Sequence, residues 1–110
     1  MQIRKTYREI NPTILFDEAK ELVLRQKITL EQNKLETYSN PSDSSNFMYR
    51  GTLTFSIQGR EGLRIHIIGV DKGETKLMLD SDDSLFSPER VTALEKDLHF
   101  LLGAFELKPG

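Results

Sequence analysis

Residues 53–67 read LTFSIQGREGLRIHI, and the spacing of their apolar side chains specifies a pair of strands. Hydrophobic and polar residues alternate on both sides of a glycine-containing turn, as in a β-hairpin with one buried face. The alternation extends back to Phe47 and forward to Leu79, so it predicts an antiparallel meander of three strands. The residues expected on its buried face are Phe47, Tyr49, Leu53, Phe55, Ile57, Leu63, Ile65, Ile67, Leu77 and Leu79.

Two short segments connect these strands. Gly59-Arg60-Glu61-Gly62 and Asp71-Lys72-Gly73-Glu74 both contain glycine, which adopts the positive φ that tight hairpins often require. We therefore expect tight turns at both places.

Two helices flank the meander. Asn11-Pro12 predicts a helix start, because asparagine caps free N–H groups and proline fits the first helical position; this helix is expected to reach about Gln26. Ser87-Pro88 repeats the signal for a second helix. Residues at helical spacing form the apolar faces of the two helices. They are Leu15, Ala19, Leu22 and Val23 in the first, and Val91, Leu94, Leu98, Leu101, Leu102 and Phe105 in the second.

The remaining segments have weaker patterns. Ile3–Ile10 predicts a charged edge strand. Another strand begins near Ile28, and a break in its alternation predicts a bulge near Gln32-Asn33 or a start after it. Ser39–Asn46 is interpreted as a polar surface loop, and residues 108–110 as a frayed end.

Together these elements predict an α+β protein with the order β-α-β-β-β-β-α. The sheet is expected to be antiparallel, with four or five strands and with both helices on one face. A chain of 110 residues is the size of one compact domain, so residues 1–110 are interpreted as a single α+β domain.

Composition limits the location and the chemistry. The chain contains no cysteine, which excludes disulfides, thiolate catalysis and cysteine-bound zinc, and favours a reducing compartment. No apolar run approaches the ~20 residues that span a bilayer, and the first residues lack the apolar core of a signal peptide. We expect a cytoplasmic protein with no membrane association.

Charge is unevenly distributed along the chain, whose net charge is −2. Residues 1–30 have an excess of basic side chains, and residues 71–97 have an excess of acidic ones. Neither segment is the concentrated basic patch of a protein that depends on phosphate contacts, so nucleic acid is an unlikely partner.

The order of elements, with a long helix last, resembles small helix-grip domains and the related TATA-binding-protein-like half-domains. The resemblance covers nearly the whole chain but rests on element order, without a family motif. It implies a sheet curled around the final helix, with an apolar ligand between the two, or a DNA-binding role for the opposite sheet face. The DNA-intercalating aromatic pairs of a TATA-binding half-domain are missing from the sequence.

No pattern of residues indicates catalysis, a metal site or a cofactor. His66 and His99 lie on different predicted elements without a zinc-binding spacing. Asp80, Asp82 and Asp83 are close together, but the glycine and glutamate of a calcium loop are absent. No P-loop, Rossmann glycine pattern or nucleophile elbow is present. We expect a protein that is not an enzyme and binds no metal or nucleotide.

The first functional hypothesis is a binding domain that holds a small apolar ligand between the final helix and the sheet. Large apolar side chains are expected in this interior, where they would line a ligand site or simply form the core. The candidate ligand-binding residues are Phe47, Tyr49, Phe55, Leu98 and Phe105.

The alternative is a protein-interaction or homodimer module that uses the opposite face of the sheet. A fully solvated face would be polar throughout, but here methionine and isoleucine are mixed with arginine, as at partner surfaces. Binding of nucleic acid is a minor version of this hypothesis. The candidate partner-binding residues are Met48, Arg50, Arg64, His66, Ile68, Lys76 and Met78.

Overall fold

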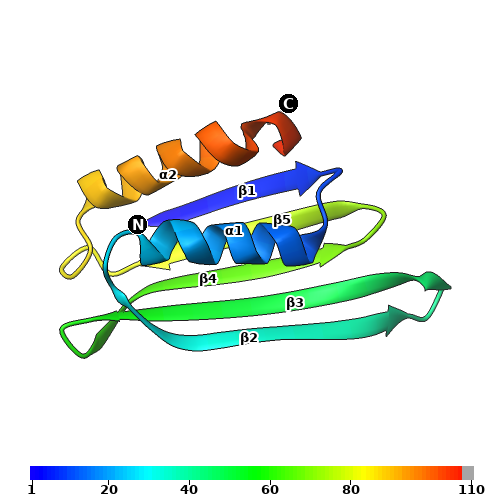
Figure 1. Cartoon of the computed structure of the whole chain (residues 1–110), viewed down its shortest axis with the longest axis horizontal. Helices are drawn as coiled ribbons and strands as arrows, with labels where there is room; N and C mark the ends of the chain where they lie inside the picture. The colour runs from blue at the N-terminus through cyan, green and yellow to red at the C-terminus, as the bar shows by residue number, and fades with distance from the viewer. Residues whose placement is uncertain (108–110) are drawn as a thin grey trace.

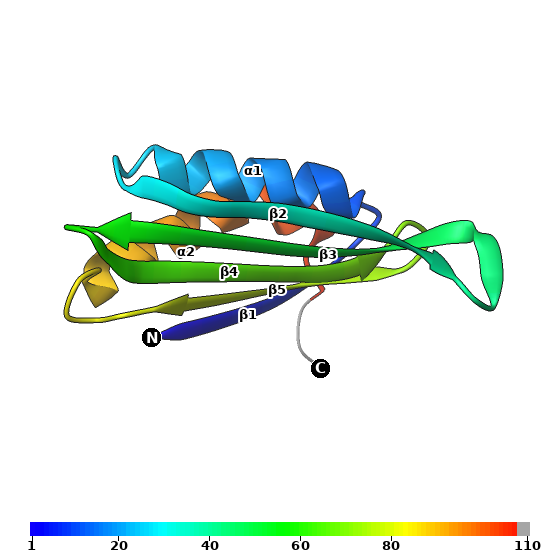
Figure 2. The same cartoon turned by 90° about the horizontal axis from the view of Figure 1, so that it is seen from below.

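Five antiparallel strands form one sheet, and two helices cover one of its faces, in the computed structural model of residues 1–107 (Figures 1 and 2). The strand order is β1-β5-β4-β3-β2. This architecture confirms the predicted α+β class, element order and placement of both helices. The strands are β1 (Gln2–Arg8), β2 (Thr29–Asn40), β3 (Asp43–Ile57), β4 (Arg60–Val70) and β5 (Glu74–Ser81). The helices are α1 (Pro12–Leu24), α2 (Pro88–Leu102) and the short 3-10 helix η1 (Gly103–Phe105).

Both helices start where the sequence predicted. The Asn11 side chain accepts a hydrogen bond from the backbone N–H of Thr13 over 2.8 Å, and the Ser87 hydroxyl accepts one from the N–H of Arg90 over 3.3 Å. A proline follows each cap and occupies the first helical position. α1 ends at Leu24, shortly before the predicted Gln26.

The core lies between the helices and the sheet. The four predicted core residues of α1 are buried, together with Phe16. In α2 the buried stripe is Val91, Leu94, Leu98 and Leu102, but the prediction for Leu101 was wrong, because this side chain is 40% exposed. Leu101 lies beside the stripe, where Leu102 occupies the last inward position of the helix. Phe105 is half-buried in η1 and packs against the core.

The interpretation of Ser39–Asn46 as a loop was also wrong. β2 continues to Asn40 and β3 begins at Asp43, so a tight hairpin replaces the loop. The side chain of Asn40 accepts a hydrogen bond from the backbone N–H of Ser42, and that of Asp43 accepts one from the N–H of Ser45, both over 3.0 Å. Asn, Asp and Ser therefore form the turn here.

The β2–β3 hairpin extends past the end of the helix layer (Figure 2). Along β3, Leu53 and Phe55 are buried under the helices, whereas Tyr49 is half-buried and Phe47 is 40% exposed. The predicted alternation is correct for all four residues. Burial of Phe47 and Tyr49 is incomplete because the sheet is longer than the helices that cover it.

Two local features fix the register of the hairpins. β2 is bulged between Leu30 and Gln32, next to the predicted position, so Leu35 still lies on the helix side. The turn between β3 and β4 places both Gln58 and Gly59 at positive φ, as in a two-residue hairpin loop. The predicted frayed end at residues 108–110 lies outside the described residues.

Within residues 1–107, no helix combines the length and the hydrophobicity needed to cross a bilayer.

Candidate functional site

The sheet has a second face, which the helices do not cover (Figure 2). Strand register aligns its side chains in rows, such as Arg4, Met78, His66, Thr52 and Lys34, followed by Thr6, Lys76, Ile68, Arg50 and Glu36. We call this surface the open face. Its residues are Gln2, Arg4, Thr6, Gln32, Lys34, Glu36, Tyr38, Met48, Arg50, Thr52, Thr54, Arg64, His66, Ile68, Val70, Lys76, Met78 and Asp80.

All seven residues predicted for a partner-binding face lie on the open face. Ile68 is 50% exposed and Met48 is 38% exposed, although both are large apolar side chains. Val70 and Met78 beside them are partly exposed. The predicted mixture of apolar and basic side chains therefore exists on a continuous surface.

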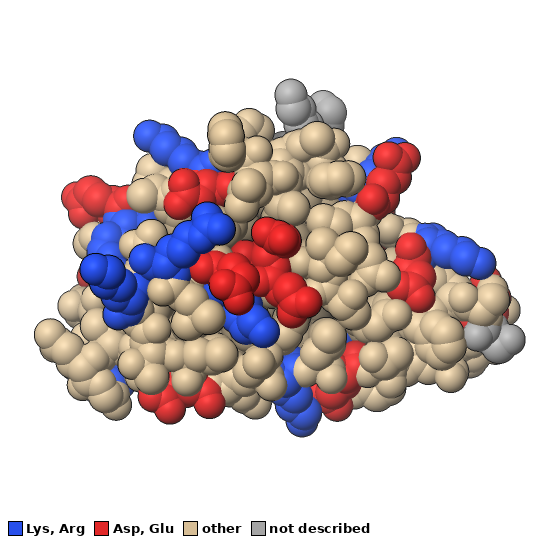
Figure 3. Space-filling model, viewed as in Figure 1, with Lys and Arg blue, Asp and Glu red and all other residues tan. Residues whose placement is uncertain are grey.

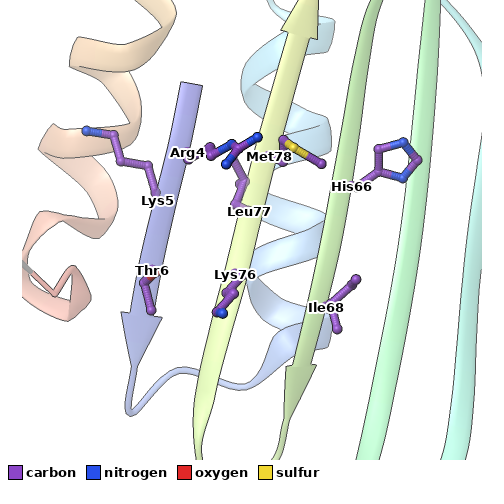
Figure 4. A pocket seen from close by; sticks show the side chains of 8 residues that line it. All are labelled: Arg4, Lys5, Thr6, His66, Ile68, Lys76, Leu77 and Met78. Atoms are coloured by element: carbon purple, nitrogen blue, oxygen red, sulfur yellow. The ribbon is translucent and has the colours of Figure 1, made fainter. Parts of the chain in front are cut away.

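Two shallow hollows lie side by side on the open face. The larger has a volume of about 610 Å³, and its lining includes Arg4 and Lys76 (Figure 4). The other, of about 480 Å³, extends toward Arg50 and Lys34. His66, Ile68 and Met78 line both, so they form the ridge between the two hollows. The hydroxyl of Thr52 lies 3.5 Å from Nδ1 of His66 at the side of this ridge.

The open face carries more cations than carboxylates. Arg64 pairs with Glu61 over 2.8 Å, and Lys34 lies 3.7 Å from Glu36. Arg4, Arg50 and Lys76 form no ion pair with any residue of the described chain, 1–107. The basic residues of the open face are Arg4, Lys34, Arg50, Arg64 and Lys76, and the acidic ones are Glu36 and Asp80.

The two helices have the opposite balance, and carboxylates gather near the middle of the surface that they form, beside a group of basic side chains (Figure 3). The two helices contain Asp17, Glu18, Glu21, Glu89, Glu95 and Asp97 against Lys20, Arg90 and Lys96. The molecule is therefore polarised, with a basic sheet face and an acidic helix layer, although its net charge is only −2. Such a field orients a charged partner toward one face.

The five residues predicted for an interior ligand site are not brought together. Phe55 and Leu98 are fully buried within the core cluster, and Phe105 packs against it. Tyr49 and Phe47 lie on the extended hairpin, where the Tyr49 hydroxyl donates to Asp71 Oδ2 over 3.3 Å. A ligand between the final helix and the sheet stays a prediction.

A partly buried polar cluster joins β1 and α2 to the end of the described chain. Lys5 Nζ lies 3.3 Å from Glu95 Oε2 and 3.6 Å from Glu106 Oε2. The hydroxyl of Tyr7 and Oε1 of Glu106 are buried and have no hydrogen-bond partner among residues 1–107. Burial, and then the charges of Glu106 and Glu95, raise the pKa of Tyr7. This cluster disfavours the tyrosinate, so Tyr7 is unsuited to act as a base.

The two histidines lie on different elements, and hydrogen bonds within the aspartate-rich loop hold one of its carboxylates. His66 lies on the open face, and His99 is exposed on α2, as predicted. The side chain of Asp82 accepts hydrogen bonds from the N–H and hydroxyl of Ser84, which lower the pKa of Asp82. In the part of the chain that the structure describes, no three His, Asp or Glu side chains are grouped to hold a metal ion.

Comparison with protein-family models, with curated proteins and with solved structures finds no match to this chain.

Sequence reasoning missed part of the open face. Arg4, Thr6, Lys34 and Glu36 belong to it through the pairing of β1 with β5 and of β2 with β3. In β1 the sequence signal is alternation. Ile3 and Tyr7 are buried on the helix side, so Arg4 and Thr6 between them point to the open face. The bulge in β2 hides the corresponding signal there, because it reverses the alternation between Leu30 and Gln32.

Proposed function

We propose that this protein is a non-enzymatic binding module whose open face docks an acidic segment of a protein partner. The observation that carries the proposal is a set of three cations, Arg4, Arg50 and Lys76, that form no ion pair within residues 1–107 and lie around the half-exposed Ile68. Their charges complement carboxylates, and Ile68 supplies apolar area that a partner side chain would cover.

The kind of partner follows from the side chains. Sheet surfaces that bind single-stranded nucleic acid usually stack bases on Phe, Tyr or Trp rings, but among the described residues of the open face Tyr38, near its edge, is the only one of these. Methionines at Met48 and Met78 instead suit an adaptable contact with protein side chains. A protein segment is thus favoured over an oligonucleotide.

A face-to-face homodimer is disfavoured by charge. A two-fold axis through the middle of the open face would bring Arg50, Arg64 and Lys76 against the same surface of a second copy. Like charges in such an interface repel. The interior ligand hypothesis has less support, because its five candidate residues do not line one space.

A defined peptide pair tests the proposal. The probe is a synthetic peptide of alternating glutamate and leucine, and its control is the matched lysine–leucine peptide. Binding is measured by calorimetry and by backbone amide shifts at Arg50, Ile68 and Lys76, at low and high salt. We expect the acidic peptide to bind at low salt, weaken as salt rises, and shift these amides; the basic peptide should not bind.

Paired charge reversals complete the test. Arg50→Glu with Arg64→Glu changes the open face, whereas Arg25→Glu with Lys96→Glu makes the same charge change at exposed positions on the helix side. The first variant should lose the acidic peptide and the second should retain it. Equal binding by both variants, or no binding by the natural protein, contradicts the proposal. Preferential capture of an oligothymidylate strand would favour nucleic acid instead.

A further inference from the structure

We propose that the protein forms a homodimer in which the free edge of β2 pairs antiparallel with β2 of a second copy, in a register centred on Leu35. The two sheets then form one continuous sheet. This interface uses the β2 border of the open face, through Lys34 and Glu36, and leaves Arg50, Ile68 and Lys76 at its centre free on both copies.

The two edge strands of the sheet, β1 and β2, differ in whether another segment pairs with their outer side. At the β1 edge, the backbone N–H of Leu107 donates to the carbonyl oxygen of Thr6 over 2.7 Å, and Tyr7 forms a β-bridge with Glu106. The end of the described chain therefore occupies the β1 edge at Thr6 and Tyr7. β2 pairs with β3 on one side, and no other strand among residues 1–107 pairs with its outer side.

The β2 edge is suited to strand addition. The bulge lies near its start, and Gln32–Ser39 then pairs with β3 in unbroken register, so the edge is regular along this stretch. Most of its side chains are exposed. A long regular edge presents a row of backbone donors and acceptors that another strand can satisfy.

Charge selects the register of self-pairing. In a symmetric antiparallel pair, a residue faces one from the other copy on the same side of the sheet. Centring on Leu35 sets each Lys34 opposite the partner's Glu36, so two opposite-charge pairs form. Centring on Lys34 or on Glu36 instead places that charge against itself.

The charge of Glu36 is maintained by its neighbours. The Tyr38 hydroxyl donates to Glu36 Oε2 over 2.6 Å, and this hydrogen bond lowers the pKa of Glu36, with a smaller contribution from Lys34. The hydrogen bond therefore favours the carboxylate form, which in this register faces a lysine of the second copy.

The same register also covers apolar surface on the helix side. Leu35 is 36% exposed and would meet Leu35 of the second copy. Cross-strand contact between two leucines removes apolar area from water on both chains. One register thus satisfies the backbone edge, both charges and the exposed leucine.

Charge reversal tests this register directly. Sedimentation equilibrium over a micromolar concentration series measures dimerisation of the natural protein, of Lys34→Glu, of Glu36→Lys and of the double variant. Each single variant places like charges opposite each other at two positions and should weaken dimerisation by about tenfold. The double variant restores opposite charges and should dimerise like the natural protein.

Mixing the two single variants is the decisive step. Lys34→Glu presents only carboxylates and Glu36→Lys presents only ammonium groups, so an equimolar mixture should form a heterodimer tighter than either homodimer. Urea denaturation of each variant checks that the monomer fold is retained. A monomeric natural protein throughout the series overturns the proposal, and so do variants that all dimerise equally or a mixture without heterodimer.

Discussion

The guanidinium group of Arg90 donates a hydrogen bond to the backbone carbonyl oxygen of Gln26 over 3.0 Å. Arg90 lies in the first turn of α2, and Gln26 follows the end of α1. The same guanidinium lies 4.4 Å from the centre of the buried Phe86 ring. One side chain thus joins the start of the second helix to the end of the first, where backbone carbonyls lack partners within the helix.

Replacing Arg90 by methionine should destabilise the protein. The variant keeps most of the side-chain packing but loses a charged hydrogen bond and the contact with the aromatic ring, at a cost of about 1–3 kcal/mol. The stability of Arg90→Lys should lie between that of the natural protein and that of Arg90→Met, because lysine keeps the charge without the planar group. Urea denaturation measures both, and a loss below about 0.5 kcal/mol for methionine would contradict this role.

Truncations in α2 should separate a core leucine from a surface one. Leu98 is buried, so Leu98→Ala is expected to cost about 2–5 kcal/mol. Leu101 is 40% exposed, so Leu101→Ala should cost less than about 1 kcal/mol. Chemical denaturation of both variants makes the comparison. Equal losses would mean that the end of α2 packs differently.

The fold could be predicted because the local signals agree with the long-range packing. Alternation in β3, β4 and β5, and a cap with proline before each helix, specify the elements and their order. The errors arose where burial depends on another element. Periodicity alone does not show that Leu102 is buried at the end of α2 while Leu101 is exposed. It also does not show that the helix layer stops short of the part of the sheet that contains Phe47.

The open face was predictable only in its central strands. Arg50, His66 and Ile68 follow from alternation, whereas Lys34 and Glu36 depend on the bulge that sets the register of β2. Polar residues before Phe47 suggested a loop, yet Asn40 and Asp43 form the turn of a hairpin. The free edge of β2 was invisible because edges are defined by the order of strands in space.

Removal of the Tyr7 hydroxyl should not weaken the fold. The hydroxyl is buried and makes no hydrogen bond within the described chain, so it contributes a desolvation cost without a compensating contact. We expect Tyr7→Phe to leave the free energy of unfolding unchanged or raise it by up to about 1 kcal/mol. Tyr7→Ala is the control and should cost about 3–5 kcal/mol, since it empties the site. A clear loss for phenylalanine would reveal a partner for the hydroxyl.

The same residue should make the protein sensitive to alkali. Burial first, and then Glu106 and Glu95, raise the pKa of Tyr7 above its ordinary value of about 10. The unfolded chain therefore releases this proton at lower pH than the folded protein, and stability falls as pH rises above about 10. Urea midpoints at about pH 9 and pH 11 should drop more for the natural protein than for Tyr7→Phe. An equal drop would assign the sensitivity to other groups.

Gly51 allows α1 to approach the sheet closely. It lies in β3 opposite Leu35 and Ile67, and a Cβ atom there would lie 2.5 Å from Cδ2 and 2.8 Å from Cε2 of Phe16. Because Phe16 is buried, its ring has little room to move away. Gly51→Ala should therefore overpack the core and destabilise the protein by about 1–3 kcal/mol.

A second substitution distinguishes this clash from a general preference for glycine at position 51. Phe16→Leu removes the outer ring atoms and should by itself cost about 1 kcal/mol or more, because it leaves a cavity. In the Gly51→Ala background it should cost less, since the added methyl group fills part of that space. Urea denaturation of the four proteins gives the coupling free energy between the two positions. Additive losses would show that Phe16 does not limit residue 51, and that the close approach of α1 has another cause.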